Sequence, residues 1–140
     1  MKRFILLIMI CLPITAMAQD RAFSQMVEKY SSKQNCTTIE LTKDALNMET
    51  NISNMWAISV ETAELIEEFS SDVEQVISSK YTPMLSVNHD GESVKIYSIQ
   101  KDGKICDIVV CSISHSEGVI VRIVGDDITL SQAASLISTQ

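Results

Sequence analysis

Four apolar segments alternate with three polar turn clusters in MLSVNHDGESVKIYSIQKDGKICDIVVCSISHSEGVIVRIV, residues 84–124 of the chain. Two of the turn clusters contain the pair Asp-Gly, at Asp90-Gly91 and at Asp102-Gly103. This pair readily adopts the positive φ angles of a tight hairpin turn, and the flanking segments are rich in Val and Ile, which favour strands. The stretch therefore predicts a four-stranded antiparallel meander.

The third apolar segment of this stretch, residues 105–113, is apolar on both faces of an extended strand. Strands with two apolar faces are typical of the interior of a sheet. We therefore expect this strand at the centre of the sheet, with helices over one face and a further helix or a partner subunit over the other. Its two predicted faces are Ile105, Asp107, Val109, Cys111 and Ile113, and Cys106, Ile108, Val110 and Ser112.

The remaining segments supply further strands and the helices that would cover the sheet. Apolar residues at helical spacing predict helices over residues 23–33 and 62–80, and strand-forming residues predict strands over 36–41 and 55–60. A last helix is expected after residue 127. The apolar positions of the three helices are Phe23, Met26, Val27 and Tyr30, then Ala63, Ile66, Phe69, Val73, Val76 and Ile77, and finally Leu130, Ala133, Ala134 and Ile137. We predict an α+β fold, an antiparallel sheet with a C-terminal four-stranded meander and helices packed mainly on one face.

The first 18 residues have the pattern of a secretory signal peptide. Lys2 and Arg3 precede an apolar run, and Ala16-Met17-Ala18 is typical of a cleavage site. The apolar run is shorter than the roughly 20 residues that span a bilayer, and the predicted mature chain contains no longer one. We expect cleavage near Ala18, a single domain over residues 19–140, and a periplasmic or secreted location.

The charge of the chain argues against two classes of partner. The sequence has 18 acidic and 11 basic residues, and removal of Lys2 and Arg3 would leave nine basic residues and a net charge of −9. Such a surface repels nucleic acid phosphates and anionic lipid headgroups. We therefore expect no nucleic acid partner, whereas an envelope protein or a second copy of the chain is compatible with the composition.

Three cysteines remain after the predicted cleavage, Cys36, Cys106 and Cys111. Cys106 and Cys111 are five residues apart on one predicted strand, which places them on opposite faces. One interpretation is a disulfide between Cys36 and either Cys106 or Cys111. The alternative is that all three are free thiols packed as small apolar side chains. The sequence leaves both readings open.

Both histidines of the chain, His89 and His115, lie in turns of the meander. The first and third turns of a meander emerge at the same end of the sheet, so these side chains would line one edge. Imidazoles are ligands for zinc and copper, which makes His89 and His115 weak candidates for a metal site. Exposed turn residues without a ligand explain the same pattern, and we predict no cofactor.

No catalytic residue can be assigned from the sequence. The chain lacks Gly-x-Ser-x-Gly, His-Glu-x-x-His, Cys-x-x-Cys and any phosphate-binding glycine loop. A nucleophilic cysteine needs a nearby base and an accessible position, and the two cysteines of the meander lie in an apolar strand. Trp56 and Tyr97 are instead candidates for exposed anchors that contact a partner.

The chain resembles a known family at several places. These are Lys101-Asp102-Gly103-Lys104-Ile105, Asp107-Ile108-Val109-Val110 and Val121-Arg122-Ile123-Val124-Gly125-Asp126 before a closing helix, together with Phe23 to Tyr30 and Met84 to Glu92. They are similar to the bacterial envelope proteins grouped as domain of unknown function four-two-five-two. The resemblance implies a small exported protein of Gram-negative bacteria, with no agreed activity and no family catalytic residues.

The function that we expect from the sequence is therefore an exported, non-catalytic interaction or sensing module of the bacterial cell envelope. One alternative is a periplasmic carrier of a small apolar ligand or a metal ion. A second alternative is a thiol-dependent enzyme. The sequence does not identify the partner, the ligand or the oligomeric state.

Overall fold

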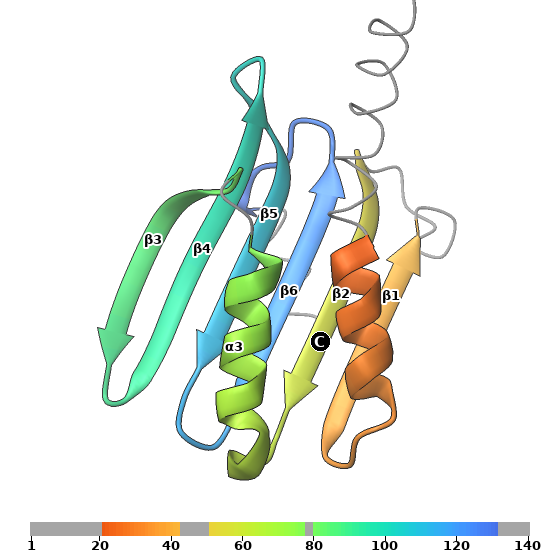
Figure 1. The fold of residues 1–140 in the computed structure, drawn as a ribbon. Coiled ribbons are helices and arrows are strands. Elements are labelled where there is room, and N and C mark those ends of the chain that lie inside the picture. Colours follow the sequence, from red (N-terminus) through yellow and green to blue (C-terminus); the bar gives the residue numbers. More distant parts are fainter. Residues whose placement is uncertain (1–20, 43–50, 78–79, 132–140) are drawn as a thin grey trace, which may run out of the picture.

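The structure is a computed structural model, and it describes residues 21–42, 51–77 and 80–131. A six-stranded sheet of order β1-β2-β6-β5-β4-β3, antiparallel at every pairing, forms its centre, so the predicted α+β class is confirmed (Figure 1). The predicted signal peptide and positions 133–137 of the last apolar stripe lie outside the described residues. The strands are β1 (Cys36–Thr42), β2 (Ile52–Val60), β3 (Thr82–His89), β4 (Glu92–Lys101), β5 (Lys104–Ile113) and β6 (Gly118–Gly125).

The predicted meander is confirmed as the four consecutive strands β3 to β6. Asp90 and Gly91, and likewise Asp102 and Gly103, have positive φ angles, as a two-residue hairpin turn requires. The predicted central position of β5 is also confirmed, because it pairs with β4 on one side and β6 on the other. β2 then pairs with β6 and β1 with β2, so the two edges of the sheet are β1 and β3.

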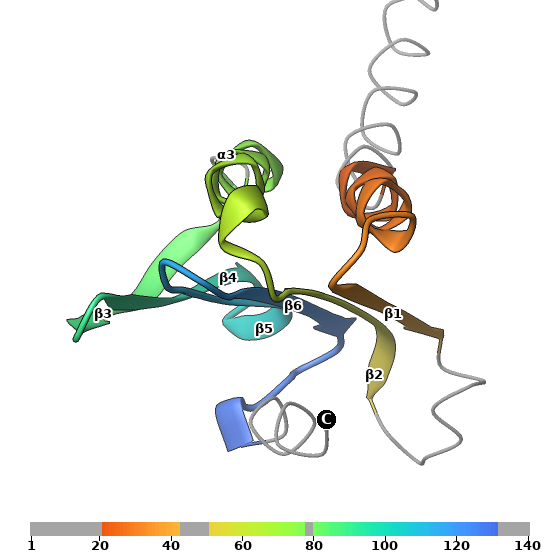
Figure 2. The same ribbon diagram turned by 90° about the horizontal axis from the view of Figure 1, so that it is seen from below.

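A helix over residues 21–31 and the helix α3 (Ile66–Val76) lie on one face of the sheet (Figure 2). Both bury most residues of the stripes that their spacing predicts, and their side chains meet those of the sheet in one core. Lys29 joins the helices, since its Nζ lies 2.9 Å from Oε1 of Glu68 and 2.7 Å from Oδ2 of Asp72. The buried stripe residues are Phe23, Met26, Tyr30, Ile66, Phe69, Val73 and Val76.

The second helix is shorter than the predicted span of residues 62–80. It is preceded by a 3-10 turn, η1 (Ala63–Leu65), and it ends at Val76 because Ile77 has an extended backbone with ψ 100°. Ala63 is exposed in that turn, so its assignment to the buried stripe is wrong. The pattern of apolar residues located the helix correctly, but it could not show where the helical backbone begins.

Two strands differ in detail from the prediction. β2 begins at Ile52, three residues before the predicted strand over residues 55–60, because the Ile52 side chain is buried in the core on the face opposite the helices. In β5 the register against β4 passes from Asp107 directly to Ile105, which leaves Cys106 as the extra residue of a bulge. The bulge turns Ile105 toward the core on the face opposite the helices, so the predicted grouping of Ile105 with Asp107 on one face is wrong.

The other face of the sheet has its own core beneath residues 126–131, which cross it on the side away from both helices (Figure 2). Ile128 is buried there, and its N–H donates a hydrogen bond to the carbonyl of Ile105 at 2.8 Å. The buried members of this core are Ile52, Met55, Ala57, Ile108, Val121, Ile123 and Ile128. No helix among the described residues is long and apolar enough to cross a membrane.

The start of β6 packs closely against α3, and this contact can be tested. A Cβ atom added at Gly118 would lie 2.7 Å from Cδ2 of the fully buried Phe69 ring. We expect Gly118→Ala to lower the free energy of unfolding by about 1–3 kcal/mol, because the buried ring or the strand must shift to make room for the added methyl group. Urea denaturation monitored by tryptophan fluorescence measures this change. Ser116→Ala, in the exposed turn before β6, is the control, and equal stability of the two variants would contradict the prediction.

Candidate functional site

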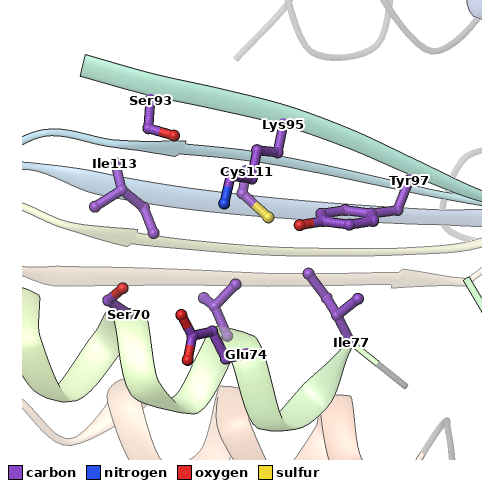
Figure 3. Close-up of a pocket in the computed structure, with 9 residues that line it drawn as sticks. Ser70, Glu74, Ile77, Ser93, Lys95, Tyr97, Cys111 and Ile113 are labelled. Atoms are coloured by element: carbon purple, nitrogen blue, oxygen red, sulfur yellow. The ribbon is translucent and has the colours of Figure 1, made fainter. Parts of the chain in front are cut away.

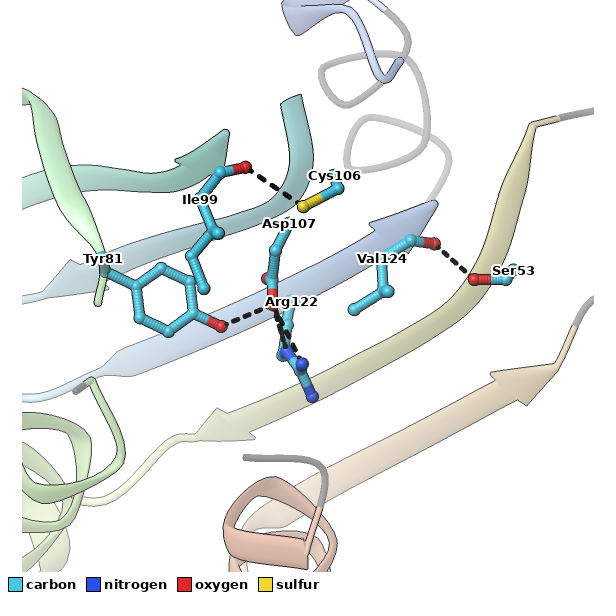
Figure 4. A network of polar contacts seen from close by, with 7 residues as sticks. All are labelled: Ser53, Tyr81, Ile99, Cys106, Asp107, Arg122 and Val124. Carbon is cyan, nitrogen blue, oxygen red and sulfur yellow. Dashed lines mark hydrogen bonds and ion pairs between the residues drawn. The ribbon is translucent and has the colours of Figure 1, made fainter. Parts of the chain in front are cut away.

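A buried ion pair joins β5 and β6 beneath the helices (Figure 4). Arg122 Nη2 lies 2.9 Å from Oδ2 of Asp107, and Nε of the same guanidinium donates to both carboxylate oxygens at 3.3 and 3.2 Å. The hydroxyl of Tyr81 donates a further hydrogen bond to Asp107 Oδ2 at 2.8 Å. Burial, with the neighbouring Asp107 carboxylate, raises the pKa of the Tyr81 phenol. The three side chains therefore form a closed polar cluster in which the phenol stays protonated.

Arg122 also lies between two aromatic rings. Its guanidinium carbon is 4.7 Å from the ring centre of Phe23 and 4.7 Å from that of Trp56. Trp56 is only 5% exposed, so the expectation that it is an exposed anchor for a partner is wrong. The signal for this cluster in the sequence is a single charged residue in each of two apolar segments, Asp107 in residues 105–113 and Arg122 in residues 118–125. The cluster is enclosed, and we assign it to stability.

The ion pair and the Tyr81 hydrogen bond make different contributions to stability. Asp107→Asn removes the carboxylate charge beside a buried guanidinium and should lower the free energy of unfolding by about 3–5 kcal/mol. Tyr81→Phe removes one hydrogen bond and should lower it by about 1 kcal/mol. Guanidinium denaturation of the two variants in parallel provides the comparison. Equal losses would show that the ion pair is not the main stabilising contact in the cluster.

The two candidate metal ligands lie in exposed turns. His89 ends β3 with a side chain that is 82% exposed, and its Nε2 lies 3.0 Å from Oδ2 of the adjacent Asp90. His115 is exposed in the connection from β5 to β6, at the same end of the sheet (Figure 1). Within the part of the chain that the structure describes, no group of three or more His, Cys, Asp or Glu side chains has the geometry to hold a metal ion.

A cleft of about 280 Å³ lies between α3 and strands β4 and β5. Tyr97, which the sequence predicts as an exposed anchor, is half-buried in the wall of this cleft. Figure 3 shows Tyr97, Lys95 and Cys111 on the sheet side, facing Ser70 and Glu74 on the helix. The cleft therefore combines an apolar floor with an ammonium, a carboxylate and hydroxyl groups. Its lining residues are Ser70, Val73, Glu74, Ile77, Ser93, Lys95, Tyr97, Cys111 and Ile113.

The three cysteines of the described chain are free thiols. Cys111, in the wall of the cleft, is 4% exposed, and burial raises its pKa to about 12. Burial also raises the pKa of Cys36 and of Cys106, and the Cys106 thiol donates a hydrogen bond to the carbonyl of Ile99 at 3.4 Å. A thiolate is the reactive form of cysteine, so these environments disfavour nucleophilic catalysis.

The reactivity of Cys111 can be measured directly. A pKa of about 12 leaves on the order of 10⁻⁴ of the thiol ionised at pH 8. We expect iodoacetamide to leave Cys111 unmodified in the folded protein at pH 8 and to modify it in urea, as read by peptide mass spectrometry. Labelling of Cys111 in the folded protein should increase only as the pH rises toward 12. Rapid modification of Cys111 at pH 8 would contradict this and would favour a thiol-dependent enzyme.

The edge strand β3 is the most exposed element of the sheet. Every residue from Thr82 to His89 is exposed, and Met84, Leu85 and Val87 are 40%, 46% and 43% accessible. Leu85 and Val87 pair with Ile96 and Val94 of β4, so these four apolar side chains share the face of the sheet opposite the helices. The signal for this edge in the sequence is the absence of Asp, Glu, Lys and Arg from residues 82–89.

The fold and these sites define a small α+β protein with one antiparallel sheet and an open apolar edge, without a cluster of potential metal ligands among the residues that the structure describes. The family model described as Domain of unknown function (DUF4252) matches residues 15–136. The chain therefore belongs to this family, as the resemblance in its sequence indicated. No curated protein and no solved structure matches the chain.

Proposed function

We propose that this protein is an exported, non-catalytic interaction or sensing module of the bacterial cell envelope that binds a polypeptide partner through β3. The exposure of β3 along its whole length is the observation that carries the proposal. An open strand edge presents unpaired N–H and C=O groups, to which an extended segment adds as a further strand. The signal-peptide pattern of residues 1–18 supports export into the periplasm of a Gram-negative cell or beyond it.

The chemistry of the edge specifies the kind of partner. Leu85 and Val87 on one face of β3 would contact apolar side chains of the added strand, whereas Ser86 and Asn88 on the other face would meet polar ones. From Thr82 to Asn88, β3 carries no acidic or basic side chain, so this part of the strand offers nothing to pair with a charged segment. In this proposal the helices cover mainly one face of the sheet, and the outer part of the other face is available to the partner.

A second candidate function, carriage of a small ligand, is supported by the cleft beneath α3. Its apolar floor and its facing ammonium and carboxylate, from Lys95 and Glu74, suit a small amphiphilic molecule. Native mass spectrometry of the protein purified from its own envelope separates the two functions. A bound molecule of low mass would favour carriage, whereas a bound polypeptide would favour the interaction module.

The proposed contact can be tested by photo-crosslinking in the native bacterium. A photoactivatable phenylalanine analogue at position 87 should form an adduct with a polypeptide in the envelope fraction. The same analogue at position 130 is the control, since Leu130 is 50% exposed but lies outside β3. Absence of an adduct at position 87, equal adducts at both positions, or recovery of the protein in the cytoplasmic fraction would contradict the proposal.

A further inference from the structure

The two edges of the sheet differ in how well they are protected from strand addition. β1 carries the exposed charge of Glu40, and its Ile39 and Leu41 are half-buried against the second core. β3 has Pro83 and an adjacent irregularity in its pairing, and both lie near its first residue. From Leu85 to Asn88 it has none of the charges, prolines or bulges that protect strand edges.

We infer that the strand added to β3 is β3 of a second copy of this chain, in antiparallel pairing centred on Ser86. This inference rests on the proposed function and names its partner. The charge of the chain favours this occupant. Acidic residues outnumber basic ones by 18 to 11, yet residues 82–88 are uncharged, so two copies can meet there without like charges opposing each other at the contact.

The backbone alternation of β3 fits this register. His89 and Glu92 close a two-residue hairpin, so they form a hydrogen-bonded pair, and every second residue before His89 also directs its backbone groups toward β4. Leu85 and Val87 belong to that set. The N–H and C=O groups of Ser86 and Asn88 therefore point to the open edge, where Ser86 can exchange both hydrogen bonds with Ser86 of a second copy.

The side chains are self-complementary in the same register. Leu85 of one copy lies opposite Val87 of the other, on the face that also carries Val94 and Ile96. A continuous apolar row across the contact follows, in the order Val94, Val87, Leu85, Ile96, and the two-fold symmetry repeats it. Pro83 lacks the N–H that further pairing would need, so the paired segment is limited to about residues 84–88.

Self-pairing also removes the hazard of an open edge. A contact between two copies of β3 is two-fold symmetric and uses the same surface on both, so it stops at a dimer. Addition of β3 to β1 of another copy would leave a free edge at each end and would continue into a filament. The exposed charge of Glu40 on β1 disfavours that second arrangement.

Disulfide trapping of the protein exported by its own cell tests the register. In the proposed pairing the Cα atoms of the two Ser86 residues are about 5.5 Å apart, within the range that a disulfide spans. The two Asn88 residues are offset by four positions, about 14 Å along the strand. Ser86→Cys should form a covalent dimer under mild oxidation, with the bond mapped to position 86, whereas Asn88→Cys should form no disulfide between the two copies.

Sedimentation over a series of protein concentrations provides a second readout. Ser86→Pro removes the outward N–H without removing a bond to β4 and should abolish the dimer, whereas Ser86→Ala keeps the N–H and should retain it. If Ser86→Pro does not fold, as judged by circular dichroism, the comparison of disulfide trapping in Ser86→Cys and Asn88→Cys decides. The inference would be overturned if the wild-type protein were monomeric at all concentrations or if positions 86 and 88 were trapped equally. It would also be overturned if a folded Ser86→Pro variant still formed the dimer. An envelope adduct at position 87 with another protein would overturn the inference while leaving the proposed function intact.

Discussion

The ion pair between Asp107 and Arg122 is the interaction on which the arrangement of the helical side depends. It connects the two central strands, and Tyr81, from the segment that leads into the edge strand, hydrogen bonds to it. Phe23 of the first helix and Trp56 of β2 lie over the guanidinium. Desolvating two charges is costly, and the carboxylate, phenol and aromatic rings together offset that cost. The cluster thus specifies where the first helix and the start of β3 sit.

The local parts of this fold could be predicted from the sequence because their causes are local. The Asp-Gly turns determine the hairpins, and the 3.6-residue spacing of apolar side chains identifies the buried faces of both helices. The bulge at Cys106 could not be predicted, since it follows from the pairing of β5 with β4 and not from any turn residue. The start of β2 was missed because Ile52 stands between polar neighbours, and its burial depends on packing against distant strands.

The candidate site residues show the same division. Trp56 looked like an anchor because it is the single tryptophan of the chain, but its environment is decided by Arg122, which is 66 positions further along the sequence. Tyr97, which the sequence predicts as an exposed anchor, is half-buried beside a cavity because β4 passes beneath α3. The direction of each side chain follows from strand alternation, whereas the element that covers it follows from the order of strands in the sheet. That order depends on β2 pairing with β6, a contact between segments that are far apart in the chain.

The pairing of β2 with β6 also explains why β3 is the strand left exposed. A meander has two edges, and β2 occupies the one at β6, so the free edge is the first strand of the meander. The first helix and α3 pack on the core formed by β2, β6, β5 and β4, and no β3 side chain belongs to either core. An edge in this position could be protected by one or two lysines at no cost to packing, because every one of its side chains is already in solvent. Three large apolar side chains occupy it instead, and this departure from ordinary edge protection is the physical reason to propose β3 as the binding surface.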